Sequence, residues 1–124
     1  ELYNDFSLSP LHQTLEELHE DFGTMVFFKA VMDNKIVGSV RGFSVGDTCY
    51  IWRLIIHPLY QNLGIGKKIM DVLEAYFKCR RYEVFTGNKT KRKIFFFQKI
   101  GYRIFASEKV SEKRDRVYLE KVKT

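Results

Sequence analysis

The residues best suited to chemistry are two glycines, Gly64 and Gly66, in a short segment that begins at Gln61. An apolar run, residues 50–56, precedes this segment, and residues 67–80 after it have helical periodicity. A strand that turns through a glycine-rich loop into a helix directs several backbone N–H groups at one point, and the helix N-terminus adds a partial positive charge. A glycine has no Cβ, so a ligand can approach its backbone closely. The spacing therefore predicts a phosphate site.

Two common phosphate motifs do not match this segment. No Gly-Lys-Ser/Thr is present, so it is not a P-loop, and the third glycine and later acidic residue of the dinucleotide pattern are missing. A Gly-x-Gly pair is weak evidence, because many strand-to-helix turns use glycine only for packing. The residues before the pair are more specific, since His57 and Pro58 follow the apolar run and Gln61 stands three residues before Gly64.

Two stretches resemble a known family. Residues 54–66 resemble the acetyl-CoA loop of the GCN5-related N-acetyltransferases, the GNAT family, whose loop amides hold the CoA pyrophosphate. Residues 85–102 look like the family's second signature, a strand, a loop and a helix ending in a Leu-Tyr-x-x-x-Gly-Phe/Tyr pattern. Within it, residues 86–90 are similar to the Thr-Gly-x-x-Ser variety of many bacterial members. The resemblance implies one acetyltransferase-like domain over residues 1–124, short at its N-terminus because the family's first strand and helix are not found.

The resemblance implies that acetyl-CoA is the cosubstrate and that its acetyl group moves to an amine of an unidentified acceptor. The pyrophosphate is expected on the amides of residues 62–67, and pantetheine along the backbone of residues 54–56. A side chain introduced at Gly64 or Gly66 is expected to enter the phosphate position. The cofactor-binding residues implied in this way are Leu54, Ile55, Ile56, Gln61, Asn62, Leu63, Gly64, Ile65, Gly66, Lys67, Thr90, Lys93 and Phe97.

Two of these positions depart from the family pattern. Phe97 stands where members often have a tyrosine that is thought to protonate the departing CoA thiolate, and Phe97 has no proton to give. Lys93 stands where members often have an asparagine that contacts CoA, and a cation could still reach a phosphate or a pantetheine oxygen. Three readings stay open: the thiolate leaves without help from the protein, another donor serves, or catalysis is impaired. In the last reading the chain is a CoA-binding sensor or interaction domain of the same fold.

The reaction that the resemblance implies needs a general base for the amine proton. Glu83 is a candidate because it begins a strand beside the expected pantetheine channel, although it could instead pair with an arginine at residues 80–81. Tyr82 is a candidate proton donor or acceptor, as are Tyr50 and Tyr60. Each tyrosine is more often a packing aromatic with a solvated hydroxyl.

Arg53 is the candidate for substrate binding. Strand alternation predicts that its side chain faces opposite to Trp52, Leu54 and Ile56. Arg53 either extends to solvent or lines the acceptor cleft and selects a substrate that carries a carboxylate.

The chain is basic, with a net charge of +6 from 21 basic and 15 acidic residues, and a cluster of charges lies at residues 89–93. Nucleic-acid binding is one interpretation, and attraction of a polyanion such as CoA is a second. A solvated surface is the third, and we favour it for most of these charges. We therefore expect no nucleic-acid partner.

Composition indicates one globular domain, since the 124 residues are 45% hydrophobic and 29% charged and no apolar run is long enough for a membrane span. Cys49 and Cys79 are expected to be reduced packing residues of a cytoplasmic protein. No Cys/His cluster has the spacing of a metal site, so no metal is expected. The expected partner is a small-molecule or peptide amine, with no membrane.

The elements that must position these residues follow from periodicity, capping and turn residues. The expected helices lie at residues 9–22, 67–80 and 90–100, and the expected strands at residues 25–32, 35–43, 48–56, 83–86, 102–106 and 117–122. This order predicts an α/β (α+β) fold with a mixed, mainly antiparallel central sheet and helices on both faces. The missing first strand would leave a sheet edge that a second copy could cover, so a homodimer is one possible assembly and the oligomeric state stays open.

Overall fold

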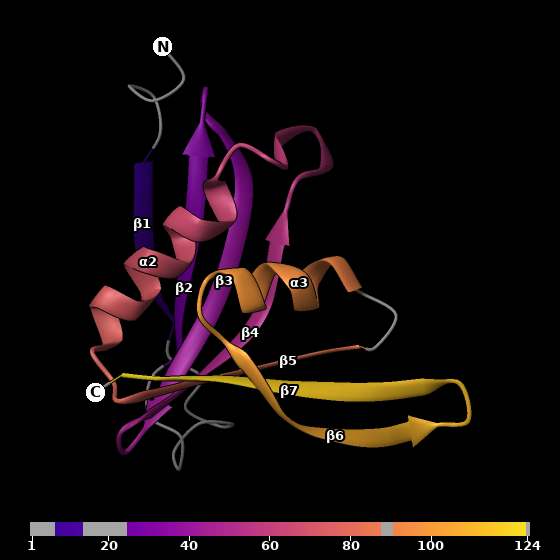
Figure 1. Cartoon of the computed structure of the whole chain (residues 1–124). Helices are drawn as coiled ribbons and strands as arrows, with labels where there is room; N and C mark the ends of the chain where they lie inside the picture. The colour runs from indigo at the N-terminus through magenta and orange to yellow at the C-terminus, as the bar shows by residue number, and fades with distance from the viewer. Residues whose placement is uncertain (1–6, 14–24, 88–90, 124) are drawn as a thin grey trace.

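The structure, a computed structural model, describes residues 7–13, 25–87 and 91–123. Seven strands within these residues form one sheet in the order β1-β2-β3-β4-β5-β7-β6 (Figure 1). The elements in chain order are β1 (Ser7–Gln13), β2 (Met25–Met32), β3 (Lys35–Val45), β4 (Thr48–Ile56), the 3₁₀ helix η1 (Pro58–Tyr60), α2 (Ile65–Phe77), β5 (Arg81–Gly87), α3 (Lys91–Lys99), β6 (Arg103–Ser111) and β7 (Arg114–Val122).

Strands β2, β3 and β4 form two hairpins whose turns are visible in the sequence. Asp33 and Asn34 both have positive φ, 50° and 63°, and such turns match the twist of a two-residue hairpin. Gly46, with φ 61°, makes the second turn. β2 alternates between buried and half-buried residues, as a strand with one face on the core should. The expected strands at residues 25–32 and 48–56 are confirmed.

The pairing of β4 with β5 decides the shape of the sheet. These two strands are parallel, and α2 is the helical crossover that a parallel connection requires. Their pairing extends only to Ile51 and Val84. Beyond that point β4 stays beside β3, while β5 stays beside β7 as far as Gly87. The two strands therefore diverge, and Figure 1 shows β4 rising while β5 runs sideways from their shared start.

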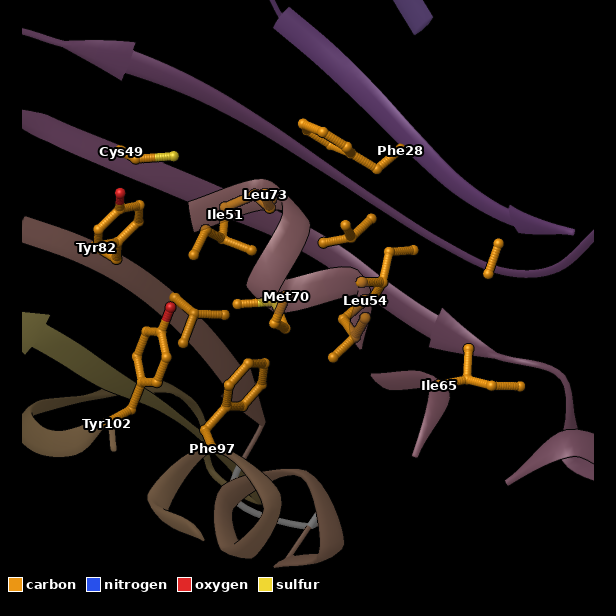
Figure 2. Packing of buried hydrophobic residues seen from close by; sticks show 14 of the residues in the cluster. Phe28, Cys49, Ile51, Leu54, Ile65, Met70, Leu73, Tyr82, Phe97 and Tyr102 are labelled. Carbon is orange, nitrogen blue, oxygen red and sulfur yellow. The ribbon is translucent and has the colours of Figure 1, made fainter. Parts of the chain in front are cut away.

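Both described helices lie on the same face of the sheet. The apolar stripe of α2, which includes Ile69 and Leu73, is fully buried, and Phe97 of α3 joins the same core cluster. Figure 2 shows Met70 and Leu73 of α2 near Ile51 and Leu54 of β4, and Phe97 of α3 beside Tyr102. A mixed, mainly antiparallel sheet with packed helices is therefore confirmed. Both helices of the described residues cover one face, which leaves the other face of β4 and β5 without a helix from those residues.

The N-terminal strand is the largest difference from the sequence expectation. A helix from Ser9 is wrong over residues 9–13, because Ser7–Gln13 form β1 and pair antiparallel with β2. Pro10 fits an edge strand, since one side of an edge strand needs no N–H donors. The chain thus supplies a strand before β2, contrary to expectation, and β1 covers the sheet edge that the sequence had left open to a second copy. The remainder of the expected helix, residues 14–22, lies outside the described residues.

The C-terminal hairpin is longer than the sequence indicates. β6 and β7 extend over Arg103–Ser111 and Arg114–Val122, whereas the sequence predicts strands over residues 102–106 and 117–122. Every residue of β6 except Ala106 is exposed, so the outer half of the hairpin has no alternation of polar and apolar residues to reveal it.

None of the helices in the described ranges is long and apolar enough to cross a bilayer.

Candidate active site

A β-bulge in β4 lies directly after the end of the β4–β5 pairing. Between Trp52 and Ile55, β4 carries one more residue than the paired segment of β3. The extra residue is Arg53, whose φ of 53° is rare for a residue other than glycine. Trp52 and Arg53 are consequently both exposed and Leu54 is buried. The alternation expected from the sequence is therefore wrong, since Trp52 and Leu54 lie on opposite faces.

The divergence of β4 and β5 creates an opening in the sheet. From residue 52 onward, the side of β4 that faced β5 has no strand partner among the described residues. Backbone N–H and C=O groups on such an edge can pair with an extended ligand. The far end of this edge is occupied by Gln61, whose Nε2 donates to the Ile56 carbonyl oxygen at 3.2 Å. Gln61 thus ties the glycine loop to the end of β4.

The start of α2 opens beside this edge. Its N-cap is Gly64, with φ 80° and no capping side chain, and the first helical bond runs from the Lys68 N–H to the Gly64 carbonyl at 3.1 Å. The N–H groups of residues 65–67 precede that bond, so they are the donors that a helix start leaves for another acceptor. The first turn has no acidic residue and contains Lys67. This arrangement suits a bound anion.

The two glycines of the loop have different roles. A Cβ on Gly64 would meet nothing within 4 Å, whereas a Cβ on Gly66 would lie 3.1 Å from Cζ of Phe96. Gly66 therefore allows α3 to pack against α2. A side chain at Gly66 would meet the Phe96 ring first, and its entry into the phosphate position stays a prediction.

The helix-free face carries a cavity of about 340 Å³ beside the opening, which we call the aromatic cavity. Tyr50 and Trp52 of β4 and Glu83 and Phe85 of β5 face it, alternating along each strand with residues that face the helices. The residues that line the cavity are Phe43, Val45, Tyr50, Ile51, Trp52, Glu83, Phe85 and Tyr118. Arg53 is not one of them.

Glu83 both lines the aromatic cavity, as a general base would, and pairs with an arginine, the alternative that the sequence left open. Its side chain is only 20% exposed, it lines the aromatic cavity, and its Oε1 lies 2.8 Å from Nη1 of Arg81. Nε of Arg81 also donates to Oε1 of Glu120 at 2.8 Å. Burial opposes the Arg81 charge, but the hydrogen bonds to Glu120 and Glu83 outweigh it and raise the pKa of Arg81. The Glu83 carboxylate is therefore held in place at the cavity wall.

Tyr82 lies on the helix side of β5, away from the aromatic cavity. It is fully buried, its hydroxyl donates to the Glu74 carbonyl oxygen at 2.7 Å, and it accepts from the Cys79 N–H at 2.9 Å. Burial raises its pKa to about 12. This location does not fit the proton donor that the sequence suggested (Figure 2).

The two cysteines are also unsuited to chemistry. Cys49 and Cys79 are free and buried, and burial raises the pKa of both thiols. Thiols in such surroundings are inert packing groups. Within the described ranges, no three His, Cys, Asp or Glu side chains lie where they could hold a metal ion.

The remaining candidates lie on the helix side or in the loop. Phe97 is buried, with its ring 5.5 Å from that of Tyr102, and Lys93 is half-buried on α3, where burial lowers its pKa. His57 is structural, since its Nδ1 accepts from the Leu59 N–H at 3.1 Å and caps η1. Thr90 lies outside the described residues.

Sequence reasoning missed most of the aromatic cavity. Trp52, Phe85, Phe43 and Tyr118 come from four strands and were read as packing residues or not singled out. One signal was available, because Phe85 lies two residues from Glu83 and so shares its face of the strand. The other walls come from strands far apart in the chain.

Comparisons with known proteins agree with this geometry. A protein of Bacillus subtilis (strain 168) named as an acetyltransferase is 29% identical over 99 residues, which cover 80% of this chain and 67% of that protein. Across four curated relatives that it matches, this chain spans between 40% and 67% of their length. A family model described as the acetyltransferase (GNAT) family matches residues 1–102.

Solved structures share the fold. A streptothricin acetyltransferase of Bacillus anthracis str. Ames, in complex with acetyl coenzyme A, superposes with a TM-score of 0.76 at 16% identity, covering 90% of this chain and 70% of that one. A GNAT family acetyltransferase from Elizabethkingia anophelis with acetyl-CoA bound has a TM-score of 0.72 at 19% identity, covering 93% of this chain and 97% of that one. With the family model spanning most of its residues, the chain belongs to the GNAT family of acetyltransferases.

Proposed function

We propose that the chain binds acetyl-CoA in the opening between β4 and β5 and transfers the acetyl group to an amine in the aromatic cavity. The observation that carries this proposal is the end of the β4–β5 pairing at Ile51 and Val84. The next residues, Trp52 and Phe85, belong to the cavity, and the free edge of β4 leads from there toward the start of α2. A donor and an acceptor on opposite faces of the sheet can meet at this point.

The residues present fit CoA. The N–H groups of residues 65–67 and the helix dipole would receive the pyrophosphate, with Lys67 as a nearby cation. The backbone edge of residues 54–56, apart from the Ile56 carbonyl that Gln61 occupies, would pair with the amides of pantetheine, much as an added strand pairs with a sheet edge. Two relatives of the same fold are solved with acetyl-CoA, which supports this assignment.

Acetyl-CoA, when bound, supplies an acetyl thioester. A backbone N–H of the bulged segment after Trp52 would polarise the thioester carbonyl. As the amine nitrogen bonds to that carbonyl carbon and the carbon–sulfur bond breaks, Glu83 would take the amine proton, directly or through one water. Holding the two reactants together supplies much of the rate.

Departure of the CoA thiolate must proceed without a tyrosine at position 97. Phe97 has no proton and Tyr82 is engaged on the helix side. Tyr60 is partly buried, and Lys93 has a lowered pKa, which makes its proton easier to give. The proton for the departing thiolate would therefore come from solvent, Tyr60 or Lys93. Transfer to nitrogen and a cytoplasmic location are parts of this proposal.

A pair of charge reversals on α2 tests the donor site. Lys67→Glu puts a carboxylate beside the proposed pyrophosphate and should weaken acetyl-CoA binding by roughly tenfold, measured by calorimetry. The change also removes the exposed Lys67–Asp71 ion pair at 2.9 Å, but an acid in the first turn suits the helix dipole, so the net loss of stability should be small. Lys78→Glu makes the same change in net charge at the other end of α2 and should leave affinity unchanged.

Equal loss of affinity in both variants would mean that net charge causes the loss, and that the start of α2 is not the pyrophosphate site. Turnover is measured as thiol release with a panel of amines. A parent that binds acetyl-CoA yet consumes none with any amine would favour the sensor reading over the enzyme.

A further inference from the structure

The aromatic cavity has walls made of rings that hold one another in place. The rings of Phe43 and Tyr50 stack with centroids 5.5 Å apart, and Trp52 meets Phe43 edge-on at 5.8 Å and 75°. Trp52 and Phe85 face each other at 6.2 Å and 78°, and Phe85 contacts Tyr118 at 6.0 Å. These distances and angles are those of favourable aromatic pairs. The rings come from β3, β4, β5 and β7, so the walls are fixed by the sheet before any ligand arrives.

The charges around the aromatic cavity favour one kind of ligand. Glu83 is the sole carboxylate among the lining residues, and neither lysine nor arginine is among them. Ring faces attract an ammonium group, and a carboxylate can accept its hydrogen bond. An acceptor carboxylate would lose its water here without gaining a lining cation.

Two arginines beside the cavity walls, Arg81 and Arg116, are already engaged. Arg81 is paired with Glu83 and Glu120, and Cζ of Arg116 lies 4.8 Å above the Phe85 ring while its Nη1 lies 3.6 Å from Glu108. The cavity is thus suited to a single amine on an apolar body.

Size and position define that body further. The volume of about 340 Å³ is near the lower end of the 300–1,000 Å³ typical of small-molecule sites. The Trp52–Phe85 pair flanks the opening. Tyr50 and Glu83, which pair across β4 and β5, lie two residues earlier on each strand, about 7 Å from the opening. An amine on the exposed surface of the Trp52–Phe85 pair would lie next to the opening, and a flat ring could extend along Tyr50 and Phe43.

We infer that the acceptor is an arylalkylamine, a primary amine carried on an aromatic ring and lacking a carboxylate. This inference rests on the proposed function, because it assigns the substrate class of the same site. The aromatic walls would bind the ring and the ammonium group of the acceptor, and Glu83 would accept the amine proton.

The test uses Trp52, the one tryptophan of the chain, as a reporter inside the cavity. Its fluorescence is followed while 2-phenylethylamine is added, with and without CoA present. Three comparison ligands change the chemistry: phenylalanine adds a carboxylate, butylamine lacks the ring, and spermidine lacks the ring and is a polycation. We expect saturable binding of phenylethylamine and at least about tenfold weaker binding of the other three.

Two matched variants locate the effect. Phe85→Leu removes one ring wall but keeps an apolar side chain and the Trp52 reporter, and should weaken phenylethylamine binding by about five- to tenfold. Phe95→Leu makes the same change on α3, where Phe95 is 68% exposed, and should have no effect.

Acetyl transfer is measured with the same four amines, which separates the two claims. Turnover with spermidine, butylamine or phenylalanine as efficient as with phenylethylamine would overturn the substrate class and leave the acetyltransferase proposal intact. Binding of phenylethylamine at Trp52 with no turnover of any amine would support the cavity assignment and sink the proposed function. Absence of any Trp52 response to phenylethylamine, with or without CoA, would overturn the inference.

Discussion

The two faces of β4 and β5 are built on different principles. On the helix side, the proposed donor site consists of backbone groups: the N–H groups at the start of α2 and the free edge of β4. On the opposite side, the aromatic cavity consists of side chains from four strands. The helix side also holds the buried core, whereas several lining residues of the cavity are exposed, Trp52 at 38% and Phe85 at 39%.

This difference predicts whether a substitution should change stability or acceptor binding. A backbone-built site tolerates most side-chain changes unless they disturb packing, so changes on the helix side should appear mainly as losses of stability. A side-chain-built cavity carries little of the core, so changes there should appear mainly in acceptor binding and turnover.

Replacing Glu83 should give the largest functional effect with little change in stability. Glu83→Gln keeps the shape of the side chain but removes the base, so kcat should fall by about 10²–10⁴-fold. The limb of the pH–rate profile that reports the base should disappear, and thermal unfolding should stay close to that of the parent. Activity within about twofold of the parent would mean that the base lies elsewhere and that Glu83 is only the ion-pair partner of Arg81.

The contrast between the faces predicts unequal losses of stability. Leu73→Ala removes a fully buried side chain under α2 and should lower the free energy of unfolding by about 2–5 kcal/mol. Val45→Ala, at an exposed position of the cavity, should cost less than about 1 kcal/mol. Denaturant titration of both variants measures the difference, and equal losses would refute the division of roles.

The two loop glycines allow a finer test on the helix side. Gly66→Ala places a Cβ 3.1 Å from the Phe96 ring, which must shift, and the better helix propensity of alanine offsets part of that cost, so stability should fall by no more than about 1 kcal/mol. At a temperature where the variant is still folded, its affinity for acetyl-CoA should be close to that of the parent. If Gly66→Ala keeps full stability yet loses acetyl-CoA, the glycine contacts the ligand instead of α3.

The smallest effect is expected at Phe97. If the protein is a working acetyltransferase, leaving-group protonation does not depend on this position, and Phe97→Tyr should show turnover close to that of the parent. Because Phe97 is 1% exposed, the added hydroxyl should lower stability somewhat. A silent parent beside an active Phe97→Tyr variant, assayed with the same amines, would point to a sensor that has lost its acid.

Local patterns in the sequence predicted the elements around the donor site. The alternation of β2, the turn at Asp33 and Asn34, the apolar stripe of α2 and the glycine loop are all encoded within a few residues of each other. The boundaries shifted where the signal was weak: α2 begins at Ile65 instead of residue 67, and the exposed end of the β6–β7 hairpin was missed.

The candidate site was harder to predict on its acceptor side. Glu83 was named as a possible base, and it does line the cavity, but Tyr82 beside it faces the opposite way, as strand alternation requires. Arg53 was assigned by alternation as well, and there the rule failed because of one extra residue in the strand.

By itself, the sequence determined the glycine loop, most strands and helices, and the family to which the chain belongs, because these depend on periodicity, turn residues and short motifs. Only the tertiary structure decided that residues 7–13 form a strand, that β4 bulges at Arg53, that β4 and β5 part after Ile51 and Val84, and that aromatic residues of four strands enclose one cavity. Each of these depends on which strand lies beside which. That choice is made by packing between residues far apart in the chain, and no window of neighbouring residues contains it.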